Sequence, residues 1–422
     1  MYARLVESGG RRVRIRRLGG DRAGEIRLTR LLRNAAVTPQ AMIAEAASRT
    51  GARCAGLHVL AIQDTTVVRS EGGGGLYLHP TLAVDAASGA ILGLTHAEFL
   101  SRTQGRKADR RKTPIAEKES RRWLDAADRS AEVCSAAARL TMIGDRENDI
   151  FPAFALRPAG TDLLVRAAHD RALEDGGKLF AHIDGLPVAG RAELDLPAKP
   201  GRKARRAQVA VRFATAALAR PRNGLREGLP ASLAMTVVDV REEAPPPGES
   251  PVHWRLLTTH AVTDAAEAFA IADLYRRRWA IEQLFRTLKT QGFDIEGLLV
   301  EDETPVRNLV MATLIAAATI QQLVHARDGL TEPGPLRPIT DAFEPEDQPL
   351  LEAFCARLEG KTQRQKNPHP KGSLAYGAWV CARLGGWTGY YGKPGPIVML
   401  EGWLYFQAAK HGASISAAYP DV

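Results

Sequence analysis

The spacing of apolar and polar positions predicts a mixed α/β chain whose first strand ends on a carboxylate. A short apolar run at 57–62 closes on Gln63 and Asp64, which favours a buried strand. Several further elements are expected after it. They are strands at about 78–85 and 90–95 joined at Ser88 and Gly89, a helix at about 114–138, a strand at 140–144 that ends on Asp145, and, after a short helix, a strand at 163–165.

The composition of the chain changes at about residue 170. Gly and Pro residues punctuate the segment 170–250, and valines alternate with other residues between them, which predicts a β-rich insertion. A strand at 254–258 should follow. A long helix is then expected from Asp264, with Glu267 in capping-box position, to about residue 290. The chain should remain helical to about 326 and then become Pro/Gly-rich and irregular.

This order of elements predicts an α/β fold, with a ribonuclease-H-like catalytic core interrupted by a β-rich insertion domain. In such a layer, the strands that end at Asp64 and Asp145 are neighbours, so both carboxylates emerge at the same sheet edge. The expected domains are a basic helical N-terminal region at 1–50, the first part of the core at 51–169, the insertion at 170–250, the second part of the core at 251–300, and a mainly helical C-terminal region at 301–422.

Composition narrows the class of protein. A hydrophobic fraction of 45% and a charged fraction of 25% are ordinary for a globular chain and exclude disordered and fibrous classes. The net charge of +9 favours a polyanionic partner. The longest apolar stretch, at 309–320, is too short for a membrane span, and no secretion signal is visible. Four cysteines without CxxC spacing indicate a reduced, cytoplasmic protein.

The long helix carries the sharpest chemical signal. Tyr275, Arg278, Glu282 and Lys289 are separated by 3, 4 and 7 positions, which places them on one stripe about 60° wide in a continuous helix. A separate apolar stripe is expected to dock on the sheet; its members are Leu274, Ile281, Phe285 and Leu288. The alternative interpretation is a solvated charged face with i,i+4 ion pairs.

Asp64, Asp145 and Glu282 together offer an oxygen-rich site suited to Mg²⁺ or Mn²⁺. Asp149 competes with Asp145 for the second position, and Asp145 is chosen because it ends the strand. Two such ions about 3.5–4 Å apart support phosphodiester transfer. The histidines show no ligand spacing and are interpreted as structural or surface residues; they include His58, His79, His96 and His169.

These motifs resemble the DDE transposases of the bacterial insertion-sequence-four family. The resemblance rests on Asp64 in IQDTT, Asp145 in GDRENDIF, and the helix signature Tyr275-x2-Arg278-x3-Glu282-x6-Lys289. The similarity extends through LHPTLAVD (78–85), EKESRRW (117–123), LLVRA (163–167), WRLLTT (254–259) and LGGWTGYYGKPGP (384–396). It therefore covers most of residues 20–410, although the leader before Asp64 is shorter than in many relatives, whose N-terminal region reads the transposon end.

The resemblance implies a role for each matched residue. Asp64, Asp145 and Glu282 would be catalytic and would hold two Mg²⁺ ions, for which Mn²⁺ can substitute. Trp254 is similar to an indole that stacks on a flipped base at a DNA hairpin. The remaining implied DNA contacts are Tyr275, Arg278 and Lys289. By their charge, Arg146, the basic run Arg106, Lys107, Arg110, Arg111 and Lys112, and the basic cluster 202–206 are further candidates for phosphate contacts; the alternative for the run and the cluster is a solvated charged face.

The resemblance also implies an activity. The chain would nick the transposon end, form and reopen a hairpin, and join the free 3′ end to target DNA. Its partners would be double-stranded transposon-end DNA, target DNA and a second copy in a DNA-bound synaptic homodimer, without a membrane. It would be cytoplasmic in a bacterium and nucleoid-associated when bound to DNA. The alternatives are a catalytically inactive or host-recruited DNA-binding relic, and a ribonuclease-H-like nuclease that acts on RNA.

Overall fold

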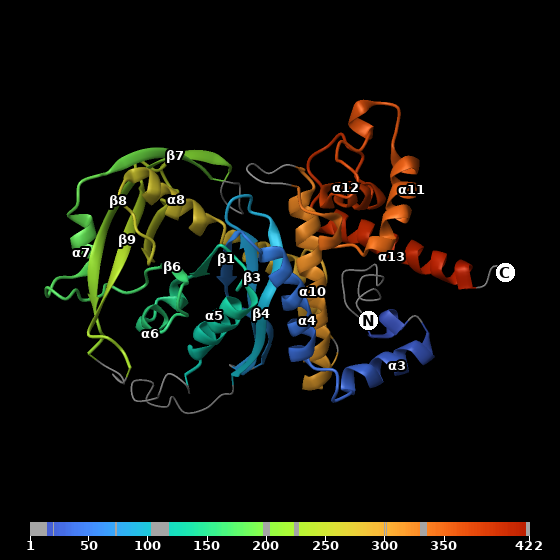
Figure 1. The fold of residues 1–422 in the computed structure, drawn as a ribbon, viewed down its shortest axis with the longest axis horizontal. Coiled ribbons are helices and arrows are strands. Elements are labelled where there is room, and N and C mark those ends of the chain that lie inside the picture. Colours follow the sequence, from blue (N-terminus) through green and yellow to red (C-terminus); the bar gives the residue numbers. More distant parts are fainter. Residues whose placement is uncertain are drawn as a thin grey trace.

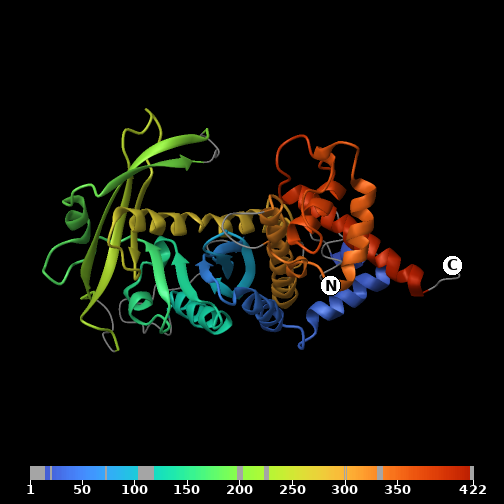
Figure 2. The ribbon, with the colours of Figure 1, turned by 45° about the horizontal axis from the view of Figure 1, so that its top comes forward.

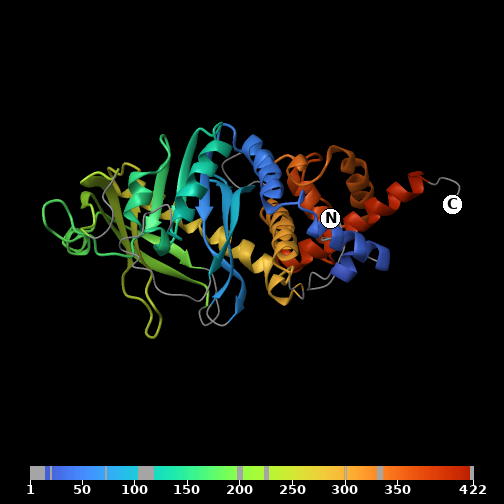
Figure 3. The same cartoon turned by 90° about the horizontal axis from the view of Figure 1, so that it is seen from below.

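The computed structural model describes residues 15–19, 21–71, 74–102, 118–196, 203–222, 228–298, 300, 302–329 and 336–418. Figure 1 shows a large twisted sheet at one end of the molecule and a group of helices at the other. Helices α4 (Pro39–Cys54) and α10 (Glu303–Ala326) lie between the two parts, as Figure 3 also shows. The predicted mixture of α and β elements is confirmed.

A single mixed sheet of ten strands spans the described part of the chain. At its centre, β1 (His58–Gln63) runs parallel to β5 (Arg139–Gly144), which runs parallel to β6 (Asp162–Arg166). Next to β1 lies the antiparallel β3 (Gly74–Asp85), which also pairs with β2 (Thr66–Glu71) and β4 (Ile91–Arg102). On the other side of β6 the order is β10 (His253–Thr258), β9 (Ser232–Glu242), β8 (Arg205–Ala219) and β7 (Gly190–Leu196).

Most strands predicted from alternation are present. The turn between β3 and β4 uses Gly89 at φ 74°, a conformation that glycine adopts without steric cost, and Asp85 accepts bonds from the turn amides. Strand β2 was not predicted. The helix expected at 114–138 is shorter in the described residues and forms α5 (Arg121–Val133).

The β-rich segment 170–250 contributes strands to the same sheet. Strand β9 pairs with β10 from His253↔Arg241 to Thr258↔Thr236, and β8 and β7 follow outward. The β-rich character is therefore confirmed, while its long strands extend the central sheet (Figure 1). The segment also contains the short helix α7 (Leu179–Asp184).

The long helix predicted from Asp264 is divided into α8 (Ala265–Arg276) and α9 (Trp279–Leu288), so the prediction of one uninterrupted helix was wrong. At the junction, the amide of Arg278 bonds to the carbonyl of Tyr275, three residues back. Such tighter bonding interrupts the α pattern without reversing the chain, and Figure 2 shows the two helices as a nearly straight rod. Asp264 does cap α8, accepting a bond from the amide of Glu267 at 2.8 Å.

The N-terminal part is helical, as predicted, with α2 (Ile15–Gly19), α3 (Arg22–Arg33) and α4. The irregular tail predicted beyond residue 326 is wrong. That region contains α11 (Gln348–Leu358), α12 (Leu374–Leu384) and α13 (Pro396–Ala418), in agreement with a mainly helical C-terminal region.

Helix α10 is longer than the apolar run that the sequence suggested. Among the described residues it is one helix whose length and hydropathy would suffice to cross a membrane. However, 72% of its most apolar window is buried inside the protein, where it contacts α4, β4 and the C-terminal helices. This burial is typical of a core helix.

Candidate active site

Asp64 and Asp145 lie next to each other at the carboxyl edge of the parallel strands. The last paired residues of β1 and β5 are Ile62 and Ile143, and each acid follows two positions later. The sharp turn after β5 passes so close that a Cβ on Gly144 would come within 2.6 Å of the Asn148 side chain. The strand register therefore brings the two carboxylates together, as predicted from the element order.

Glu282 joins this edge from helix α9 through an arginine. Nη1 of Arg278 donates to Oδ2 of Asp64 at 2.9 Å, and Nη2 donates to Oε1 of Glu282, also at 2.9 Å. The guanidinium thus links a strand end to a helix 214 residues away in sequence. The i,i+4 pair expected of a charged helix face is present, but one member also reaches the site.

The electrostatics of the site centre on Asp64. Burial raises the pKa of Asp64 to about 6, Arg278 opposes this effect, and the charges of Asp145 and Glu282 reinforce it. Its side chain is only 17% exposed. Burial is therefore the main reason why Asp64 holds its proton to a higher pH, and the charge of Arg278 offsets this effect only in part.

An aromatic pair borders the acids. Tyr275 is 6% exposed, and its ring centroid lies 6.2 Å from that of Trp254 on β10. Burial raises the pKa of the Tyr275 hydroxyl, while the charges of Arg278 and Arg166 lower it. The structure therefore brings Trp254 and Tyr275 to the edge that carries the acids.

Arg166 is a site residue that the sequence reasoning missed. It ends β6, and the register Gly144↔Val165 places it beside Asp145 on the neighbouring strand. Its Nη2 donates to the carbonyl of His253 at 2.8 Å, and burial lowers its pKa. The available signal was the arginine that directly follows the predicted strand in LLVRA.

Lys289 caps the C-terminal end of α9. Its amide bonds to the carbonyl of Phe285, four residues back, at 3.0 Å, and its ammonium pairs with Glu296 at 2.7 Å. Trp279, another residue that the sequence reasoning missed, is 45% exposed at the start of α9. Its ring stacks under the guanidinium of Arg286 at 4.9 Å.

The structure distinguishes Asp145 from Asp149. Asp145 accepts a bond from the amide of Glu147 at 2.8 Å and remains partly accessible. Asp149 is 1% exposed, and its carboxylate accepts hydrogen bonds from the Arg171 side chain and from the amides of Ala168 and His169. Asp149 is therefore a structural residue.

The predicted basic surfaces have a mixed outcome. Arg106, Lys107, Arg110, Arg111 and Lys112 lie outside the described residues. In the second cluster, Arg205 pairs with Glu242 and Glu249, and Arg206 lies near Glu193 and Asp195. Those two arginines are thus engaged within the sheet. Arg146, next to Asp145, is exposed.

Comparison with known families supplies the decisive observation. Residues 78–318, more than half of the chain, match the family described as transposase DDE domain. The chain belongs to this family. The matched segment of the transposase contains Asp145 and Glu282, whereas Asp64 precedes it by fourteen positions, so the place of Asp64 in the site rests on the geometry.

DDE transposases generally use divalent metals, and the donor set here has suitable chemistry. It consists of carboxylate oxygens, which hard cations prefer. As the described side chains stand, no group of three His, Cys, Asp or Glu is arranged to hold a metal. Arg278 bonds to one oxygen of Asp64 and one oxygen of Glu282, so its guanidinium would compete with a metal for these two oxygens.

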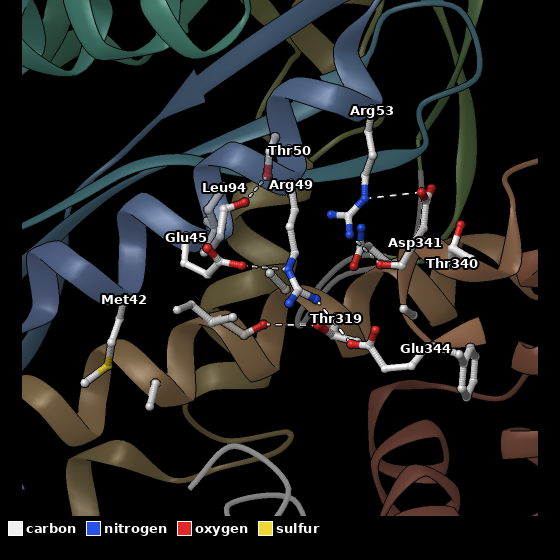
Figure 4. Close-up of a pocket in the computed structure, with 18 of the residues that line it drawn as sticks. Met42, Glu45, Arg49, Thr50, Arg53, Leu94, Thr319, Thr340, Asp341 and Glu344 are labelled. Atoms are coloured by element: carbon white, nitrogen blue, oxygen red, sulfur yellow. Dashed lines mark hydrogen bonds and ion pairs between the residues drawn. The ribbon is translucent and has the colours of Figure 1, made fainter. Parts of the chain in front are cut away.

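The transposase also contains a cavity of about 510 Å³ that is separate from the acids. It lies between α4, α10, β4 and residues 340–344 (Figure 4). Its charged side chains pair with each other: Arg49 with Glu45 and Glu344, and Arg53 with Asp341. None of its lining residues belongs to the candidate site.

Proposed function

We propose that this transposase is a hairpin-forming, cut-and-paste enzyme of the insertion-sequence-four type, with Asp64, Asp145 and Glu282 as its catalytic residues. The observation that carries the proposal is the convergence of these side chains from two parallel strands and a helix. The strand order β4-β3-β1-β5-β6, with β1, β5 and β6 parallel, supports a ribonuclease-H-like core.

In the proposed reactions, Asp64, Asp145 and Glu282 hold Mg²⁺, with Mn²⁺ as a substitute. The bound ions supply Lewis-acid activation of the attacking oxygen and of the scissile phosphate. Arg278 is the residue expected to change partners, because a metal would compete with it for Oδ2 of Asp64 and Oε1 of Glu282. A bidentate guanidinium fits a phosphate as well as it fits a carboxylate, so DNA offers Arg278 an equivalent partner.

The DNA contacts are proposed around this edge. Trp254 is the candidate for stacking on an extruded base, and its neighbour Tyr275 and the cations Arg166, Arg146 and Lys289 are candidates for phosphate contacts. Stacking on an aromatic ring offsets part of the free energy needed to unstack a base. The basic run 106–112 is proposed as a further contact.

The remaining proposals concern assembly and location. The substrates are transposon-end and target DNA. The active assembly is a DNA-bound homodimer in which the C-terminal region 301–422 provides the interface through its parts beyond α10, because α10 is buried in the core. The proposed parts are a basic helical region at 1–50, the core at 51–169 and 251–300, and an insertion at 170–250. The net charge of +9 favours association with nucleic acid in the bacterial cytoplasm.

The test is cleavage of a labelled element end by the purified full chain in Mg²⁺. Asp64→Asn, Asp145→Asn and Glu282→Gln should each abolish cleavage and leave end binding within a fewfold of wild type. Asp273→Asn is the matched control, because this carboxylate lies on α8 but is 62% exposed and pairs only locally with Arg276. Cleavage by Glu282→Gln at the wild-type rate would overturn the assignment.

The alternative function is a catalytically inactive or host-recruited DNA-binding relic. The observation that favours it is the ion pairing of Arg278 with two of the three acids. The same assay decides between the two functions, since a relic binds the element end and leaves it uncut with either Mg²⁺ or Mn²⁺.

A further inference from the structure

A buried arginine connects the two loops that carry Asp64 and Asp145. Arg122 is the second residue of α5, and its side chain is only 5% exposed. Its Nε donates to Oγ1 of Thr65 at 3.2 Å, and its Nη2 donates to Oε2 of Glu147 at 2.7 Å. Thr65 follows Asp64 directly, and Glu147 lies two positions after Asp145.

The residues that Arg122 contacts are the same ones that orient the two carboxylates. The amide of Thr65 donates to Oδ1 of Asp64 at 2.7 Å. The amide of Glu147 donates to Oδ1 of Asp145 at 2.8 Å. Arg122 is therefore connected to both acids through Thr65 and Glu147, whose side chains bond to the guanidinium and whose amides bond to the carboxylates.

The guanidinium of Arg122 is also held by contacts with its own helix and the residues just before it. Its Nη1 donates to the carbonyl of Glu119 at 2.9 Å, and its Cζ lies 5.2 Å from the ring centroid of Trp123. The same indole contacts His79 edge-on, with ring centroids 4.7 Å apart.

His79 also fixes the orientation of Thr65. It is fully buried, and its Nδ1 lies 2.9 Å from Oγ1 of Thr65. An arginine nitrogen can only donate, so the Thr65 oxygen accepts from Arg122 and its own hydrogen is available to His79. The threonine side chain is thus held from two directions.

We propose that Arg122 is a positioning residue that sets the separation and orientation of Asp64 and Asp145. The inference rests on the proposed function, because it concerns how the same acids are presented to a metal and DNA. A guanidinium suits this role since its planar fork bonds to both loops at once, whereas a lysine offers one charged atom. Burying the charge of Arg122 costs desolvation free energy. The contacts of this side chain with both loops are a structural reason for an arginine at this position.

The first test needs neither DNA nor metal. Amide hydrogen exchange of the full chain is compared for wild type, Arg122→Met and Arg122→Lys. Arg122→Met should accelerate exchange about tenfold in the segments 62–68 and 144–150 and leave α12 unchanged. Arg122→Lys should lie between the two, because it can retain one of the two loop contacts. Exchange within twofold of wild type in both segments would overturn the proposal.

The second test measures cleavage of an element end. Arg122→Met should lower kcat about thirtyfold or more, with KM for DNA changed less than twofold, and Arg122→Lys should restore part of kcat. Arg129→Met is the matched control, since this arginine lies on the same helix but is 64% exposed and pairs only with Glu132. An increase in KM at constant kcat would contradict a positioning role.

Two further variants keep the test decisive if Arg122→Met does not fold. Thr65→Val should accelerate exchange in segment 62–68 alone, and Glu147→Gln in segment 144–150 alone. Failure of either pattern counts against the path through Arg122. If wild type does not cut DNA at all, the proposed function fails, while the exchange measurements still decide whether Arg122 couples the loops.

Discussion

Replacing Asp64 with asparagine should change how the stability of the protein depends on pH. Burial raises the pKa of this carboxyl from a usual 3.8 to about 6 in the folded state. Each unit of difference between the folded-state and unfolded-state pKa corresponds to about 1.4 kcal/mol. The ionised Asp64 therefore lowers the free energy of unfolding by about 3 kcal/mol. The side chain is 17% exposed, so screening by water removes little of it.

The direction follows from proton binding. Below about pH 4 the carboxyl of Asp64 is protonated in both states and contributes no difference. Between pH 4 and 6 the unfolded chain releases this proton while the folded chain retains it, so folding becomes progressively less favourable. Above about pH 6.5 the carboxyl is mostly ionised in both states, and the destabilisation caused by burying its charge no longer increases with pH. The free energy of unfolding of Asp64→Asn, minus that of wild type, should therefore rise by about 3 kcal/mol between pH 4 and 7.

Urea unfolding followed by tryptophan fluorescence, in buffers with a chelator, measures this difference at several pH values. Asp273→Asn provides the control, because it removes the charge of an aspartate whose side chain is 62% exposed. Added Mg²⁺ should stabilise wild type at pH 7 and leave Asp64→Asn unaffected, because ligands stabilise only the state that binds them. If the difference for Asp64→Asn does not depend on pH, the pKa of Asp64 is not raised in the folded protein.

Three other variants test separate parts of the structure. In calorimetry without DNA, Arg278→Ala should bind Mn²⁺ about tenfold more tightly than wild type, because it frees Asp64 and Glu282. The same variant should lose cleavage. Weaker Mn²⁺ binding would refute the idea that Arg278 competes with the metal for these acids. Asp149→Asn should lower the free energy of unfolding at pH 7 by about 3 kcal/mol or more, since it leaves the buried Arg171 without its counter-charge, and a loss below about 1 kcal/mol in urea would be inconsistent with that burial. Trp254→Ala should slow hairpin formation about tenfold while first-strand nicking changes less, and equal slowing of both steps on a sequencing gel would argue against base stacking.

Local patterns in the sequence were sufficient where the physical cause is local. The apolar runs that end at Asp64 and Asp145 identified two strand ends, because the apolar run of a strand and the polar residue that follows it are encoded within a few positions. The cap at Asp264 was likewise recognisable, since a capping side chain bonds to an amide three residues away. The apolar stripe with Ile281 and Leu288 is buried as its spacing indicated.

Predictions failed where the outcome depends on tertiary contacts or on several weak local preferences. The break between α8 and α9 lies at Arg277 and Arg278, where no proline or glycine marks it. The C-terminal helices were obscured by Pro and Gly residues that lie mostly between them. The extension of the sheet by β9 was not predictable from alternation, because alternation does not specify the pairing partner of a strand.

The sequence by itself determined which residues could carry the chemistry and where the strands that present two of them end. Only the tertiary structure decided how these residues are connected: Arg278 between Asp64 and Glu282, Arg166 beside Asp145, and Arg122 between the two loops. Spacing within one helix or strand fixes the directions of neighbouring side chains, because the backbone geometry is regular. Contacts between residues tens to hundreds of positions apart depend on sheet register and packing, which no local pattern specifies.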